Sequence, residues 1–118
     1  MRRAGVAALI LGLSSPALAA DPDPWFGRDK ALHFTATASL AVAGYGGAAL
    51  KTADPVTRAA IGGTLGLGAG IAKELFDLAG AGDPSWRDLT WDLVGTASGV
   101  LVATTIDYLI RHATAPRE

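Results

Sequence analysis

Three long apolar runs, separated by two short helix-breaking segments, constrain this chain most strongly. The first run, at positions 31–50, carries no formal charge at pH 7. Asp54-Pro55 follows it and supplies a helix N-cap with proline at the first helical position. Positions 80–84 interrupt the second run, and Ser85 opens the third with a variant of the capping box. The pattern predicts an all-α, up-down bundle of three long helices rich in glycine and alanine, at about 29–52, 55–78 and 86–112.

The first 19 residues are typical of an export signal and not of a bundle helix. Arg2 and Arg3 precede an apolar stretch at 4–13, and an Ala-x-Ala pattern ends at Ala19. The alternative is an uncleaved signal anchor, although the run is short for a membrane span. We therefore divide the chain into a signal peptide at 1–19, an extended leader at 20–28, a bundle domain at 29–113 and a tail at 114–118.

The composition excludes several classes of protein. The 118 residues contain no cysteine, so disulfides do not stabilise an exported fold. The net charge is −1 as written, and no basic run is present, which argues against a nucleic-acid partner.

Glycines recur at every fourth position in the second and third runs, at Gly62, Gly66 and Gly70 and again at Gly95 and Gly99. Small residues at this spacing let helix backbones approach closely, as in membrane helix pairs. In water each such glycine costs about 1 kcal/mol relative to alanine. The spacing favours a membrane-embedded bundle, and a closely packed soluble bundle is the alternative.

Antiparallel threading should bring the start of the first helix, the end of the second and the start of the third to one end of the bundle. Acids, bases and one histidine occupy these three ends: Asp29, Lys30, His33, Lys73, Glu74, Asp77, Arg87, Asp88 and Asp92. The tryptophans lie at the same end, where an interfacial aromatic belt is expected, and basic residues slightly exceed acids at the other end. We expect this polar end to face the periplasm.

These residue types suggest acid–base chemistry. Asp29 and His33 are four apart and share a helix face, so the carboxylate can orient the imidazole as a general base. The plainer interpretation is an acid at a helix N-terminus beside a packing histidine. Glu74 is the expected proton donor, with Asp77 beside it, and Asp88 and Asp92 would position a headgroup or a cation.

The cations suggest a binding role. Lys30, Lys73 and Arg87 lie close to two helix N-termini, an arrangement suited to a phosphate group. Lys73 and Arg87 can alternatively form simple surface ion pairs. The acids offer oxygen ligands for Mg²⁺ or Ca²⁺, but their spacing matches no zinc or EF-hand pattern, so we assign no metal and no cofactor. Asp107 and Arg111, at the far end, are expected to form a local ion pair.

Three motifs in order resemble the YfiM family of small bacterial envelope proteins and, more distantly, VanZ-like membrane proteins. The motifs are Asp29-Lys30-x-x-His33-Phe34, Lys73-Glu74-x-x-Asp77 and Ser85-x-x-Asp88-x-x-x-Asp92-x-x-Gly95. The chain departs from these families in two places. It lacks the cysteine of a lipoprotein, and it has Asp92 where the VanZ-like pattern often has asparagine.

The resemblance implies a protein of the bacterial envelope, in or at the inner membrane, that acts on lipid headgroups or lipid-linked intermediates. We expect hydrolysis or transfer at such a headgroup, with a membrane lipid or lipid-linked intermediate as partner. A homo-oligomer or an envelope protein partner is also compatible with the pattern. The alternative function is a non-catalytic envelope protein that binds lipid or has a structural role.

Overall fold

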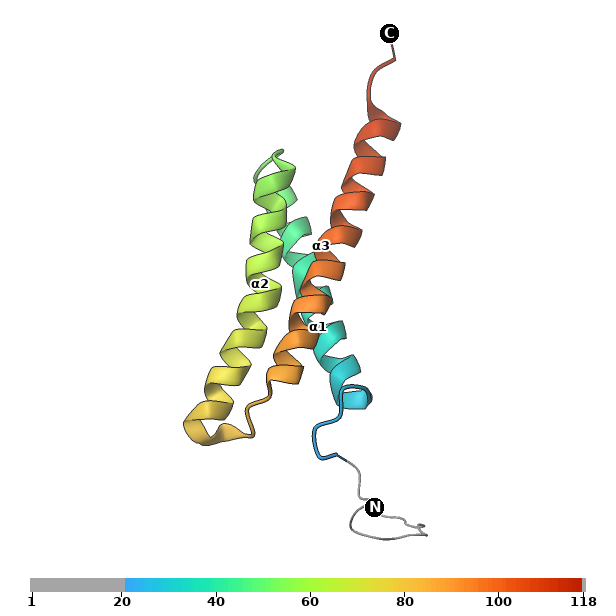
Figure 1. Ribbon diagram of the computed structural model, residues 1–118. Coiled ribbons are helices and arrows are strands. Elements are labelled where there is room, and N and C mark those ends of the chain that lie inside the picture. Colours follow the sequence, from blue (N-terminus) through green and yellow to red (C-terminus); the bar gives the residue numbers. More distant parts are fainter. Residues whose placement is uncertain (1–20, 118) are drawn as a thin grey trace.

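The computed structural model describes residues 21–117, which form three helices running up, down and up in Figure 1. They are α1 (Arg28–Ala49), α2 (Pro55–Phe76) and α3 (Trp86–Thr114), with a short π-helical turn, η2 (Asp77–Ala81), after α2. The predicted all-α bundle is confirmed, and the described residues contain no strand. The predicted signal peptide lies outside the described residues.

Side-chain N-caps start α2 and α3. The Asp54 carboxylate accepts a hydrogen bond from the Thr57 backbone N–H at 3.0 Å, and the Ser85 hydroxyl accepts one from the Asp88 N–H at 3.1 Å. Both N-caps match the sequence prediction. No side chain caps α1, and the chain enters it through Gly27, whose φ of 147° lies in a region that favours glycine.

The wide turn η2 is a feature that the sequence did not predict. Helical hydrogen bonding continues beyond Phe76 in π-type geometry and stops at Gly80, whose φ is 106°. A residue with a Cβ adopts this conformation only with strain. Asp77 lies in this turn, so the turn sets the position of one acid of the candidate site.

Glycines bring the helix backbones together. A Cβ built on Gly66 would lie 2.7 Å from the Thr96 hydroxyl and 2.8 Å from the Thr37 carbonyl oxygen. A Cβ on Gly70 would lie 2.5 Å from an oxygen of Asp92. These distances are too short for a methyl group, so glycine is required for the close approach of α2 to both other helices.

The bundle carries polar groups inside and large apolar groups outside. The buried polar residues are Lys30, Thr37, Glu74, Ser85, Asp88, Asp92 and Thr96, and the buried apolar residues are Ala41, Tyr45, Ala48 and Ala103. Large apolar side chains such as Leu101, Ile106 and Leu109 are at least half exposed. One helix, α3 with 29 residues, is long and apolar enough to cross a membrane.

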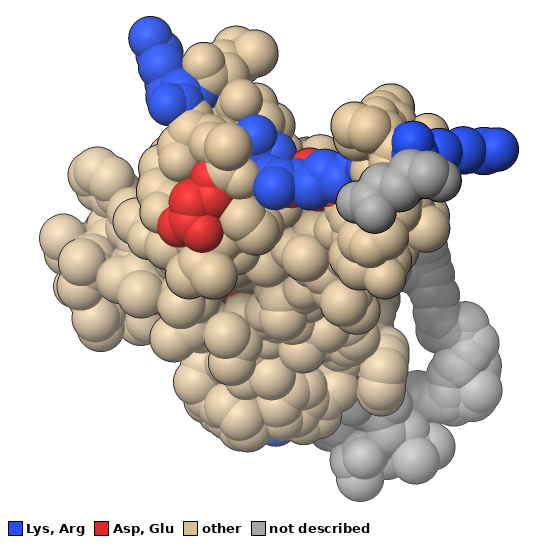
Figure 2. Space-filling model, turned by 90° about the horizontal axis from the view of Figure 1, so that it is seen from above, with Lys and Arg blue, Asp and Glu red and all other residues tan. Residues whose placement is uncertain are grey.

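At the end of the bundle that holds the turn between α1 and α2, polar contacts connect all three helices. We call these residues the basic-end staple (Tyr45, Arg58, Asp107 and Arg111). Asp107 pairs with Arg111 at 2.9 Å, as predicted, and also with Arg58 at 2.9 Å. The Tyr45 hydroxyl donates to Asp107 at 2.5 Å. Figure 2 shows this end of the molecule, where Lys and Arg side chains outnumber the acids that are visible.

Candidate functional site at the acidic pole

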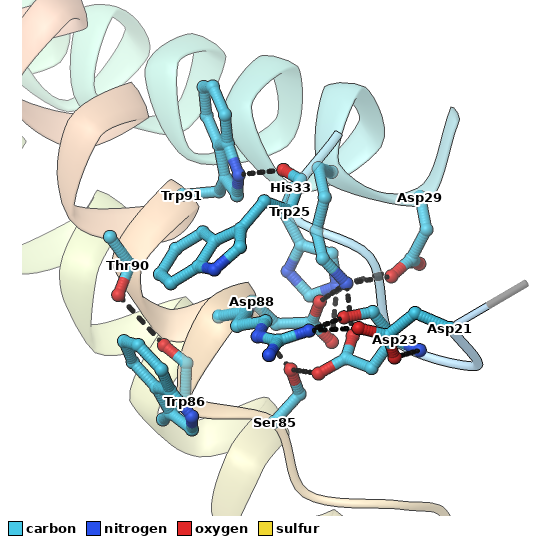
Figure 3. A network of polar contacts seen from close by, with 12 residues as sticks. Asp21, Asp23, Trp25, Asp29, His33, Ser85, Trp86, Asp88, Thr90 and Trp91 are labelled. Atoms are coloured by element: carbon cyan, nitrogen blue, oxygen red, sulfur yellow. Dashed lines mark hydrogen bonds and ion pairs between the residues drawn. The ribbon is translucent and has the colours of Figure 1, made fainter. Parts of the chain in front are cut away.

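The three helix ends and the leader meet in one cluster, which we call the acidic pole. It comprises Asp21, Asp23, Asp29, Lys30, His33, Lys73, Glu74, Asp77, Arg87, Asp88 and Asp92. The predicted gathering of the three charged ends is confirmed, because side chains from α1 and α2 both contact Asp88 of α3. Figure 3 shows the part of this cluster formed by the leader, α1 and α3.

Lys30 and Asp88 form the centre of the cluster. The Lys30 ammonium donates to Asp88 Oδ1 at 2.5 Å and to Asp29 Oδ2 at 3.0 Å, and it also contacts Asp23. The Lys30 side chain is only 3% exposed. Three carboxylates enclose this ammonium, so Lys30 is not available to bind an external phosphate as the sequence suggested.

His33 lies between two buried carboxylates of α3. Its Nδ1 is 2.9 Å from Asp92 Oδ1, and its Nε2 is 3.3 Å from Asp88 Oδ2. Asp29, the acid expected to orient the ring, is farther away, at 3.9 Å from Nε2. The orientation of the imidazole is therefore fixed from the neighbouring helix by Asp92 and Asp88.

Lys73 joins α2 to the same centre. Its ammonium lies 3.1 Å from Asp88 Oδ2, 2.7 Å from Asp77 Oδ2 and 3.4 Å from Glu74 Oε1. Its side chain remains 41% exposed, so part of it faces outward. Glu74 has a second contact, because its Oε2 accepts the backbone N–H of Ser85 at 2.6 Å. Glu74 thereby links the end of α2 to the start of α3.

The leader is also part of the cluster, and sequence analysis did not predict its contribution. Asp23 accepts hydrogen bonds from Lys30 and from the Ser85 hydroxyl, the latter at 2.6 Å. These bonds lower the pKa of Asp23 below its usual value, the Lys30 ammonium having the largest effect. Arg87 pairs with Asp21 at 2.7 Å and donates to the Asp23 carbonyl oxygen. Arg87 therefore anchors the leader.

Aromatic side chains cover the leader where it crosses α3. The rings of Trp25 and Trp86 pack edge to face with centroids 4.7 Å apart, and the Arg87 guanidinium lies 5.4 Å from the Trp25 ring. The Trp91 indole N–H donates to the Trp25 carbonyl oxygen at 2.7 Å. Such edge-to-face and cation–π contacts favour one position of the leader on the pole.

Two buried oxygen atoms near the line of α2 glycines have no hydrogen-bond partner among the described residues. They are Asp92 Oδ2 and Thr96 Oγ1. Asp77 Oδ2 also lacks a hydrogen bond of good geometry, but the Lys73 ammonium lies 2.7 Å from it. Since buried polar atoms are nearly always paired, the free oxygen of Asp92 is notable.

A cavity of about 340 Å³ opens between α1 and α2, and Asp92 is one of its lining residues. Its charged or titratable lining residues are Asp29, His33, Lys73 and Asp92, and the remaining ones are Leu32, Ala36, Thr37, Leu40, Ala69 and Gly70. A larger groove, of about 840 Å³ between α2 and α3, is lined by no charged side chain. Of these two, the smaller cavity is the one lined by charged residues of the pole.

The acidic pole has more acids than bases. Its seven carboxylates are Asp21, Asp23, Asp29, Glu74, Asp77, Asp88 and Asp92, and its permanent cations are Lys30, Lys73 and Arg87. Each of these cations contacts at least one carboxylate. The excess negative charge favours a ligand that brings a positive charge or hydrogen-bond donors.

A metal site at Asp29, His33 and Asp88 is geometrically conceivable, because their ligand atoms lie within 4.8 Å of one another. The Lys30 ammonium already lies between the two carboxylates, at hydrogen-bond distance from each. A metal ion at this triad would have to displace that ammonium. The residues do not fit a metal centre as they are arranged.

Comparison of the chain with family models, with curated proteins and with solved structures found no match. The geometry of the acidic pole is therefore the basis for inferring a function.

Proposed function

We propose that this chain is a membrane-embedded envelope protein whose acidic pole acts on the headgroup of a membrane lipid or lipid-linked intermediate. Three features support the embedding. The outward side chains are largely apolar, the buried ones are largely polar, and the helices approach through glycines. A soluble protein rarely exposes so many large apolar side chains on all of its helices.

The helix lengths agree with this placement. Helices α1 and α2, at 22 residues each, are about 33 Å long, close to the roughly 30 Å of bilayer hydrocarbon. The acidic pole and its tryptophans would then lie at the depth of the lipid headgroups. The Lys and Arg residues of the other end would face the cytoplasm, as the positive-inside rule requires.

The observation that carries the catalytic part of the proposal is the position of His33 between Asp88 and Asp92, on the wall of a cavity that opens outward. With a proton on Nδ1, His33 donates to Asp92, which fixes the tautomer of the ring. Its Nε2 then accepts a proton from a water or hydroxyl nucleophile as that oxygen bonds to the reacting centre of the headgroup. The bond to the leaving oxygen breaks, and the imidazolium returns the proton to that oxygen. This step requires Nε2 to exchange its contact with Asp88 for the nucleophile.

The other acids position this pair. Asp88 is held by Lys30 and Lys73, and Glu74 and Asp77 in turn hold Lys73 at the mouth of the cavity. Glu74 would act as the proton donor only if its bond to Ser85 opened, so we assign it to positioning. The reaction class is hydrolysis or transfer at the headgroup.

Lipid profiling tests the proposal. Membranes from cells that lack the protein are compared with membranes that contain the intact protein or its His33→Gln variant. We expect the variant to reproduce the lipid profile of the deletion while its melting temperature in detergent stays close to that of the intact protein. An unchanged lipid profile in all three membranes would overturn the catalytic role.

A non-catalytic role is the second candidate, and one observation favours it. Lys30 and Lys73 are both bound by carboxylates from other helices or the leader, so the cluster can hold the bundle together without any substrate. A purely structural cluster predicts that His33→Gln lowers the melting temperature and leaves the lipid profile unchanged. The same pair of measurements therefore separates the two candidates.

A further inference from the structure

We propose that the cavity between α1 and α2 binds the primary ammonium group of a zwitterionic membrane lipid, with Asp92 as the acceptor. This inference rests on the proposed function, because it assumes that the acidic pole lies at headgroup depth. It names the class of headgroup that the site takes, namely one with N–H donors on its terminal amine.

The free oxygen of Asp92 is the first observation. The Asp92 side chain is 1% exposed, and its Oδ1 is bound by His33 while its Oδ2 has no partner. Asp92 lines the cavity from α3, across from the residues that α1 and α2 contribute. A buried carboxylate oxygen without a donor is costly. This oxygen lies against Gly70 and is closed to solvent, so the Asp92 side chain must turn toward the cavity before an ammonium N–H can donate to it.

The charge of the pole is the second observation. Lys30, Lys73 and Arg87 are already bound by carboxylates, and the acids still outnumber them. An anionic ligand would meet uncompensated negative charge, whereas an ammonium group would reduce it.

The shape of the cavity points to a lipid and not to a free amine. Its lining runs along α1 from Asp29 to Leu40, about 16 Å at 1.5 Å per residue. The charged residues lie toward the pole, and Ala36 and Leu40 lie toward the middle of the bundle. An amphiphile matches this division, with its headgroup at the charged end and part of its chain against the apolar end.

Lys73 gives the site a place for the phosphate of the same lipid. It lines the cavity, and 41% of its side chain is exposed. A phosphate just outside the bound ammonium would bind Lys73 only in exchange for one of the carboxylates that Lys73 now contacts, on Glu74, Asp77 or Asp88.

The arrangement should discriminate against quaternary ammonium groups. A trimethylated amine has no N–H to give to Asp92, and proteins usually bind such groups in cages of aromatic rings. Within the described chain, no Trp, Tyr or Phe lines this cavity.

The test is a binding titration of the full chain in maltoside micelles. The probes are short-chain phosphatidylethanolamine, phosphatidylcholine with the same chains, and free O-phosphoethanolamine. We expect saturable binding of the ethanolamine lipid, about tenfold tighter than that of the choline lipid, which is the factor given by one charge-assisted hydrogen bond. Free O-phosphoethanolamine should bind more weakly than the lipid, since it lacks the chain.

Two variants and a control make the test specific. Asp92→Asn removes the charge, and Ala69→Leu fills the cavity without touching the ion pairs, so each should reduce binding of the ethanolamine lipid at least about tenfold. Gly68→Ala is the control, because nothing lies within 4 Å of a Cβ at that position, and it should bind normally. Equal binding of the two lipids, or normal binding by both Asp92→Asn and Ala69→Leu, would overturn the proposal.

This binding test is independent of turnover. Binding of the ethanolamine lipid without any change in membrane lipids would leave the ammonium site standing and remove the catalytic role. A change in membrane lipids without preferential binding of the ethanolamine headgroup would instead support the catalytic role and overturn the ammonium site.

Discussion

The two ends of this bundle both contain buried or half-buried ion pairs, but only one of them is complete. In the basic-end staple, Asp107 is the central acid, and both of its oxygens have partners, from Arg111 on one side and from Arg58 and Tyr45 on the other. At the acidic pole, Asp92 keeps one oxygen free beside an open cavity.

This difference distinguishes a structural cluster of ion pairs from a candidate binding site. The staple ties the turn between α1 and α2 to α3, since Arg58 and Arg111 also donate to the carbonyl oxygens of Thr52 and Ala53. Both arginines of the staple therefore bond to Asp107 and to a backbone carbonyl oxygen. The acidic pole instead holds more acid than its cations neutralise, and a ligand can complete it.

The largest expected effect is on the free energy of unfolding, and it comes from removing Asp88 at the centre of the acidic pole. Asp88→Ala leaves the ammonium of Lys30 buried with fewer partners, and the loss of one partner of a buried ion pair costs about 3–5 kcal/mol. Denaturant unfolding in detergent micelles measures this free energy. Asp83→Ala, an exposed acid near the same end, is the control and should unfold like the intact protein. Equal stability of all three proteins would contradict the central role of Asp88.

The next largest effect is also on the free energy of unfolding, through the close packing of α2 against α3 at Gly70. Gly70→Ala places a methyl group against Asp92, and overpacking of this kind costs about 1–3 kcal/mol. Gly68→Ala is the matched variant on the outward side of the same helix, and it should be neutral or slightly stabilising. If the unfolding curves of the two variants coincided, α2 would not pack through its glycines.

A smaller effect is expected at the other end. Asp107→Asn weakens the ion pairs of the staple, but Arg58 keeps its bond to the Thr52 carbonyl oxygen at 2.8 Å. The melting temperature should fall less than in Asp88→Ala, and lipid binding at the acidic pole should not change. Loss of lipid binding at a temperature where the variant is folded would show that the two ends are coupled.

The smallest effect is a change with pH in the docking of the leader. Because the pKa of Asp23 is lowered on folding, its contribution is complete above the ordinary value of 3.8 and is lost as the pH falls through the lowered value. Tryptophan fluorescence should therefore change in acid as Trp25 leaves Trp86. In Asp23→Asn this step should be absent, and a step that persists there would have to arise from another acid.

Sequence reasoning predicted the fold where its signals were local. Asp54 and Ser85 start α2 and α3 as expected, because an N-cap needs only its own first turn. The meeting of His33 with Asp88 followed from antiparallel threading of helices of similar length.

Long-range contacts escaped prediction because they leave no period in the sequence. Asp23 reaches Ser85, 62 positions away, from a leader that has no regular structure. Arg58 reaches Asp107 in the same way, 49 positions along the chain. Two acids separated by a proline and followed by a tryptophan are the only local signal of the leader, and this pattern predicts an extended segment without indicating where it docks.

The glycine contacts divide the surface of each helix into two unequal classes of position. Inward positions such as Gly66 accept no added carbon atom, whereas outward positions such as Leu101 and Leu109 leave more than half of the residue exposed. A library that shuffles only outward Leu, Ile and Val residues should retain the geometry of the pole. Natural variants of this protein should accordingly drift freely on the outside while the interior stripe stays fixed.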